Sequence, residues 1–130
     1  MKAAIVTRLS DDLSGLSIVA DAPEPPPPGA GEVTVAVAHA ALNFPDFLML
    51  QGGYQYKPEL PFTPGTEGSG TVIAAGPGAE HRLGQAVIIG ARSRLMAQRV
   101  TLPASAVRPV PAGLALDAAA AFTVAALTAW

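Results

Sequence analysis

The residues best suited to chemistry gather between Asn43 and Gly70, in the stretch NFPDFLMLQGGYQYKPELPFTPGTEGSG. This stretch holds an amide at Asn43, a phenol at Tyr54 and, among small residues, a carboxylate at Glu67. Amide and phenol groups donate and accept hydrogen bonds, so they are able to bind a polar ligand. Three interpretations arise from these residues alone: a nucleotide-binding loop, a metal site whose ligands have been replaced, or a surface loop without chemistry.

The glycines of this stretch do not form a phosphate-binding loop. GTEGSG, which runs from Gly65 to Gly70, has the spacing G-x-x-G-x-G, and it leads into the apolar segment TVIAA. The dinucleotide fingerprint has the spacing G-x-G-x-x-G, follows a strand and opens a helix. We therefore expect a tight backbone corner at a bend of a barrel, and no nucleotide site within this chain.

Metal binding and nucleophilic catalysis find little support. The chain has no cysteine, and its two histidines, His39 and His81, are far apart in the sequence. No H-x-x-x-H or H-E-x-x-H spacing occurs. Ser69 and Ser105 lack the G-x-S-x-G setting of a nucleophile, so we interpret them as ordinary small polar residues. The sequence predicts a site without metal.

Composition predicts one compact domain. The chain has 130 residues, of which 50% are apolar and 14% charged, so a substantial core is available. The net charge of −2 argues against binding to nucleic acid. No apolar run is long enough to span a bilayer, which takes about 20 residues, so we expect no membrane insertion. The lack of cysteine and of a signal peptide fits a cytoplasmic protein.

Short strands punctuated by glycine and proline predict a mainly β fold, a β-barrel or rolled sheet. Alternation of Val33, Val35 and Val37 with smaller residues is typical of a half-buried strand. One short helix is predicted from Pro45 to Gln51, with Gly52 and Gly53 ending it. The other expected strands cover residues 2–7, 16–20, 69–75, 85–89, 95–102 and 107–110.

The C-terminal segment has a different character. Asp117 is a good N-cap for a helix through the apolar residues that follow, and the chain stops at Trp130 without a capping glycine. A helix this apolar should be covered on more than one side. We therefore expect that the chain is cut here, or that a second domain or subunit covers the helix.

A set of motifs in one order and spacing resembles the N-terminal, GroES-like domain of zinc-free medium-chain dehydrogenases/reductases, and among these the NADPH:quinone oxidoreductases (zeta-crystallin-like). Zinc-dependent relatives carry a Cys just before the short helix and a Gly-His-Glu after the proline; here Asn43 and Gly65-Thr66-Glu67 stand in those places. The motifs are Asn43-Phe44-Pro45-Asp46, Gly53-Tyr54, Lys57-Pro58-Glu59-Leu60-Pro61-Phe62, Pro64-Gly65-x-Glu67-x-x-Gly70-x-Val72 and Gly76-x-Gly78.

The resemblance implies a GroES-like, partly open β-barrel with short helices, and a C-terminal helix leading toward a Rossmann domain that this chain lacks. Residues 1–115 would be the catalytic, substrate-side domain, and residues 116–130 the start of the linking helix. It further implies hydride transfer from NADPH to a quinone or activated alkene, without zinc. Dimers are common in the resembling family, so a homo-oligomer is expected. On its own, the chain is expected to be an inactive fragment.

The same resemblance implies roles for three side chains. Asn43 would hydrogen-bond the cofactor or substrate, Tyr54 would wall the nicotinamide end of the site, and Thr128 would face the cofactor. Each also has a simpler interpretation: a helix cap, a loop aromatic packed on proline, and an ordinary helix residue. We expect Glu67 to be structural and to receive backbone N–H groups at the glycine corner.

Two departures from the family pattern and two rival functions remain. Gln85 stands where the family usually has Asp, and Arg94–Gln98 replaces a glycine-rich lead into the next strand. An enoyl or alkenal reductase of the same superfamily would share nearly all of this domain. A non-catalytic GroES-like module, which binds a partner or oligomerises, would instead explain the apolar C-terminal helix.

Overall fold

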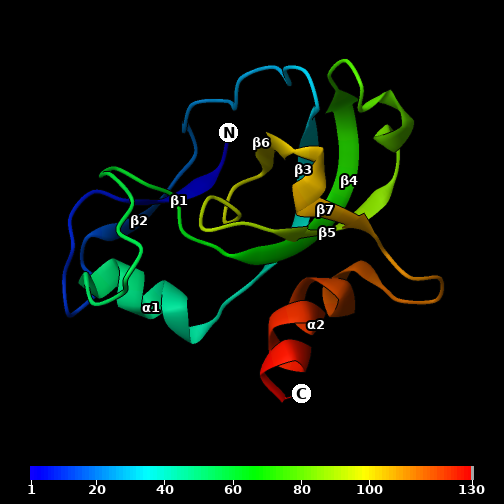
Figure 1. Cartoon of the computed structure of the whole chain (residues 1–130). Coiled ribbons are helices and arrows are strands. Elements are labelled where there is room, and N and C mark those ends of the chain that lie inside the picture. Colours follow the sequence, from blue (N-terminus) through cyan, green and yellow to red (C-terminus); the bar gives the residue numbers. More distant parts are fainter. Residues whose placement is uncertain (130) are drawn as a thin grey trace.

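A computed structural model describes the backbone of residues 1–129 and the side chains of residues 1–126 (Figure 1). Strands dominate the part of the chain before Leu116, as predicted. The elements are β1 (Ala3–Val6), β2 (Leu16–Val19), β3 (Glu32–Ala41), α1 (Phe44–Gln51), β4 (Glu67–Ala75), η1 (Glu80–Arg82), β5 (Ala86–Gly90), β6 (Arg99–Pro103), η2 (Ala104–Ala106), β7 (Val107–Pro109) and α2 (Leu116–Ala129).

Five antiparallel strands form the main sheet, in the order β6-β3-β4-β5-β7. The two edge strands, β6 and β7, are joined only by the three residues of η2, so the sheet must roll until its edges lie close together. Valines of β3 and β4 and aliphatic residues of β5 to β7 fill the interior of this roll. The expectation of a partly open, mainly β barrel is confirmed.

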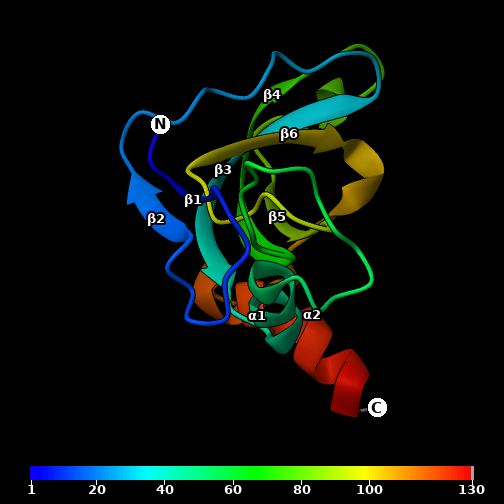
Figure 2. The same ribbon diagram turned by 90° about the vertical axis from the view of Figure 1, so that its left-hand side faces the viewer.

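A second small core lies between the hairpin of β1 and β2 and helix α1 (Figure 2). Val6 of β1, Met49 and Leu50 of α1 and Phe62 of the following loop are buried together there. Helix α1 ends as predicted at Gly52, whose φ of 80° places it in the left-handed region that favours glycine. This core fixes α1 beside the barrel.

Helix α2 packs against the sheet through one face. Ala119 and Ala120 are buried, and the helix contacts β4, β3 and β5. The Ser69 hydroxyl of β4 donates a hydrogen bond to the Leu116 carbonyl at the start of α2, so this serine is more than the ordinary small residue expected from the sequence. Phe122, on α2, remains 57% exposed. None of the described helices has the length and apolar character needed to cross a membrane.

Two predicted boundaries were wrong. The strand expected over residues 95–102 begins only at Arg99, because the N–H groups of Leu95 and Met96 donate instead to the carbonyls of Gly65 and Pro64. The last helix begins at Leu116, so Asp117 lies in its first turn, where its carboxylate accepts the Ala118 N–H. In the first case a distant segment accepts the backbone N–H groups, and in the second case a neighbouring side chain does.

Candidate functional site

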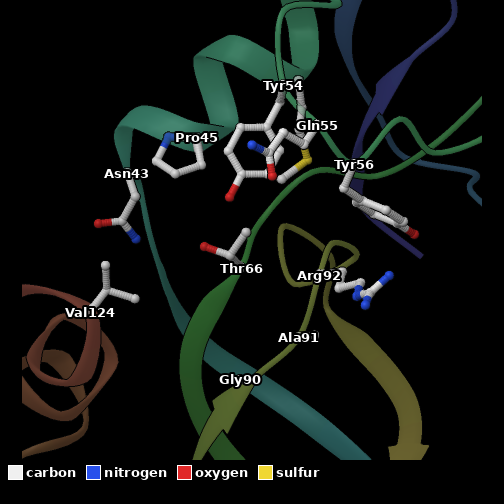
Figure 3. Close-up of a pocket in the computed structure, with 11 residues that line it drawn as sticks. Asn43, Pro45, Tyr54, Gln55, Tyr56, Thr66, Gly90, Ala91, Arg92 and Val124 are labelled. Carbon is white, nitrogen blue, oxygen red and sulfur yellow. The ribbon is translucent and has the colours of Figure 1, made fainter. Parts of the chain in front are cut away.

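A cavity with a volume of about 720 Å³ lies where α1, the loop after it, β4, β5 and α2 meet (Figure 3). Its lining is mixed, with aromatic rings, amides, a hydroxyl and one guanidinium. The lining residues are Asn43, Pro45, Met49, Tyr54, Gln55, Tyr56, Thr66, Gly90, Ala91, Arg92 and Val124. An apolar cavity with a few polar groups is the usual form of a small-molecule site.

Asn43 occupies the N-cap position of α1, and its side-chain amide also bonds to Glu67. The residue is extended, with φ −123° and ψ 162°, and forms a capping box with Asp46. Its Nδ2 donates to Glu67 Oε1 at 3.1 Å, while the Asn43 backbone N–H donates to Asp46 Oδ2 at 2.8 Å. Since an amide nitrogen carries two hydrogens, one donor of Asn43 is left for a ligand in the cavity.

Glu67 joins three elements at the edge of the cavity. Its side chain is only 2% exposed, and besides Asn43 it accepts the backbone N–H of Val124 at 3.0 Å through Oε2. The expectation that Glu67 is structural fits these bonds. The expected donors were wrong: the N–H group that it receives comes from α2, 57 residues away in sequence, and not from the glycine corner. Glu67 therefore ties α2 and Asn43 to β4.

Asp46 is the second buried carboxyl group behind Asn43. Burial raises the pKa of Asp46 above its ordinary value, the N–H groups of Asn43 and Gly65 oppose this shift, and the nearby charge of Glu67 adds to it. Asp46 Oδ2 accepts the Asn43 N–H, whereas the buried Asp46 Oδ1 has no hydrogen-bond partner among the described residues. The two carboxyl groups do not line the cavity, but they lie buried behind its Asn43 end.

Tyr54 reaches the same cavity from the loop after α1. Its ring is half-buried and packs against the small core of Val6, Met49, Leu50 and Phe62. Figure 3 shows its hydroxyl directed into the space between Asn43 and Thr66. The structure therefore brings together two of the three site residues expected from the sequence. The third, Thr128, has a side chain outside the described residues; among the α2 side chains that the structure describes, Val124 lines the cavity.

Several lining residues were missed by sequence reasoning. Arg92, from the loop after β5, stacks over Tyr56 with its Cζ 5.2 Å from the ring centroid. Thr66, at the position where zinc-dependent relatives would carry a histidine, lines the cavity with its hydroxyl. Of these missed residues, only Tyr56 could have been suspected from the sequence, because it is an aromatic residue two positions after Tyr54. The approach of Arg92 depends on strand pairing that the local sequence does not reveal.

The histidines lie away from this cavity. His39 on β3 and His81 on η1 are both exposed. Within the described residues, no three histidine or acidic side chains gather in a way that could hold a metal ion.

Comparison with known proteins identifies the family and the fold. The family model described as "Alcohol dehydrogenase GroES-like domain" matches residues 29–112. The rat protein "Synaptic vesicle membrane protein VAT-1 homolog" is 39% identical over 107 residues, which cover 82% of this chain and 26% of that protein. The rat "Quinone oxidoreductase-like protein 2" is 35% identical over 129 residues, covering 98% of this chain and 35% of that protein.

A solved structure gives the same picture. The quinone oxidoreductase of Thermus thermophilus, whose crystal structures include its complex with NADPH, superposes with a TM-score of 0.81 and 38% identity, over 99% of this chain and 39% of that one. This chain thus spans between about a quarter and two fifths of the length of these relatives. The chain belongs to the alcohol dehydrogenase GroES-like domain family, within the medium-chain dehydrogenases/reductases, and its relatives include quinone oxidoreductase-like proteins.

Proposed function

We propose that this chain is the substrate-side domain of a zinc-independent, NADPH-dependent oxidoreductase that reduces a quinone. The observation that carries the proposal is the shared cavity of Asn43 and Tyr54, which come from different segments and meet beside α2. Residues 1–115 are the substrate-side domain, and residues 116–130 begin the connection to a Rossmann domain. We place the enzyme in the cytoplasm and expect it to form homo-oligomers.

The cavity residues fit the nicotinamide end of the cofactor. A nicotinamide ring carries a carboxamide, which needs hydrogen-bond donors and acceptors beside an apolar wall. Asn43 and Thr66 supply polar groups, and the rings of Tyr54 and Pro45 supply the wall. When bound, NADPH supplies a hydride, and with one proton from water a quinone becomes a hydroquinone while NADPH becomes NADP⁺.

The chain's own residues bind, orient and exclude water. Asn43 lines the cavity and is held by Glu67, and in this proposal its remaining N–H donates to a carbonyl oxygen of the substrate or cofactor. Such a donor stabilises the negative charge that develops on the oxygen during hydride transfer. Tyr54, anchored in the small core, covers the reacting ring and limits access of water.

A titration of the 130-residue chain with menadione, followed by amide chemical shifts, tests this proposal. The chain lacks cysteine, so a quinone forms no thiol adducts. We expect shifts at Asn43, Tyr54, Thr66 and Gly90, with an affinity in the millimolar range because the cofactor wall is absent. Asn43→Ala should weaken binding about fivefold to tenfold through the lost hydrogen bond.

The control for this titration is Ser105→Ala, an exposed residue of η2 that does not line the cavity. This variant should bind menadione as the unmodified chain does. Shifts confined to other surfaces, or equal binding by Asn43→Ala and the unmodified chain, would remove the support for this site.

A further inference from the structure

Arg92 gives the cavity a charge that the proposed reaction does not use. It is the one charged residue among the described residues of the lining, and it comes from the loop after β5. In the part of the chain that the structure describes, the ion pairs join Glu24 to Arg99 and to the N-terminal amine, and no side-chain carboxylate pairs with Arg92. The guanidinium of Arg92 therefore has its hydrogen-bond donors available at the cavity rim.

The position of Arg92 is supported by an aromatic ring. The guanidinium lies over Tyr56, with Cζ 5.2 Å from the ring centroid, and Tyr56 itself packs on the small core of Val6, Met49, Leu50 and Phe62. A stacked arginine keeps its edge free for bidentate contact with a planar anion such as carboxylate. Stacking also reduces the side-chain freedom that binding would have to remove.

The cavity is electrically asymmetric. Figure 3 shows Arg92 and Tyr56 on one side of it, and Asn43 and Val124 on the other. Behind Asn43 lie the two buried carboxyl groups, Asp46 and Glu67, which are 1% and 2% exposed. An anionic group on a ligand is repelled from the Asn43 end and attracted to the Arg92 end. The asymmetry thus orients a charged ligand in one direction.

We propose that the substrate is a conjugated carbonyl compound, a quinone or enone, that carries a carboxylate or similar anionic group bound by Arg92. Its reacting end then lies at Asn43 and Tyr54, beside α2. The inference rests on the proposed function for the reaction, but the binding preference is measurable without turnover. A phosphate group of the cofactor could bind Arg92 by the same chemistry. However, Arg92 lies across the cavity from α2, the helix that leads toward the proposed Rossmann domain, and this position favours the substrate as its ligand.

Two redox-stable probes of one shape test the charge. Anthraquinone-2-carboxylate and anthraquinone-2-carboxamide are titrated into the 130-residue chain at low ionic strength, with amide shifts as the readout. We expect the carboxylate to bind about fivefold to tenfold more tightly than the carboxamide, as for a charge-assisted contact at a half-open site. Arg92→Gln should bring the two affinities together, and Arg92→Lys should keep part of the difference.

Arg8→Gln is the matched control, because Arg8 is exposed and its guanidinium bonds to Ser14, away from the cavity. It should retain the full preference for the carboxylate. If both probes shift the amides of Asn43 and Tyr54 equally in the unmodified chain, the anionic substrate is excluded while the cavity remains the proposed site. If neither probe shifts those amides, the proposed function fails as well. In the chain joined to a nucleotide-binding domain of its family, weaker binding of NADP⁺ by Arg92→Gln, with the carboxylate preference intact, would assign Arg92 to the cofactor and overturn the inference.

Discussion

Replacement of Glu67 by alanine is expected to lower the free energy of unfolding by about 2–4 kcal/mol. The Glu67 carboxylate is 2% exposed and accepts hydrogen bonds from Asn43 Nδ2 and from the Val124 N–H. Alanine leaves both donors without an acceptor in a buried place and also leaves a void. The loss should appear in chemical denaturation, and the Val124 amide should exchange its hydrogen faster as α2 loosens.

Glu67→Gln separates the lost hydrogen bonds from the void. Glutamine keeps the volume but offers one acceptor oxygen and one NH₂ group, so one of the two donors faces another donor. Glu67→Gln should lower the free energy of unfolding by about 1–2 kcal/mol, which is less than the loss expected for Glu67→Ala. Glu59→Ala, on an exposed loop, is the control and should stay within about 0.5 kcal/mol of the unmodified chain. A Glu67→Ala variant as stable as Glu59→Ala would show that this carboxylate does not join α2 to the barrel.

Gly65→Ala is expected to destabilise the chain by about 3–5 kcal/mol, because it combines backbone strain with a steric overlap. Gly65 has a φ of 111°, which side chains rarely allow, and an added Cβ would lie 2.7 Å from the Met96 backbone nitrogen. The corner is also tied to this segment by the hydrogen bond from the Leu95 N–H to the Gly65 carbonyl. Displacement of the corner should disturb Thr66 and Asp46, so the amide shifts of the cavity residues should change too.

Gly78→Ala provides the matched comparison for Gly65→Ala. Gly78 also has a positive φ, 88°, but an added Cβ would meet nothing within 4 Å. Gly78→Ala should lower the free energy of unfolding by only about 1–2 kcal/mol, because alanine is strained in the left-handed conformation. Denaturation curves of the two variants would thus measure the overlap separately from the strain. Equal losses would contradict the close packing of Gly65 on Met96.

The barrel could be predicted because its signals are local. Alternating valines of β3, glycine and proline turns and the glycine that ends α1 each act within a few residues. The false start of β6 shows the limit. Leu95 and Met96 have strand-like composition, yet their N–H groups bond to Gly65 and Pro64, about thirty residues earlier. Only the folded chain reveals that competition.

The sequence also named two candidate site residues that share the cavity in the structure. Asn43 and Tyr54 stand in motifs whose order and spacing resemble a family, so both could be named from the sequence. The partners of Glu67 and the stacking of Arg92 on Tyr56 depend on segments that are distant in sequence. No periodicity or motif in the chain encodes those contacts, so they emerged only with the packing of the strands.

Oxidation of NADPH in the presence of a quinone tests the central claim most directly. It should be measured for the 130-residue chain alone and for the same chain joined to a nucleotide-binding domain of its family. The account predicts no turnover by the chain alone, turnover by the joined protein, and a loss of about 10-fold to 100-fold in kcat/KM with Asn43→Ala. Turnover by the chain alone, or a joined protein that binds NADPH yet reduces neither a quinone nor an activated alkene, would contradict it.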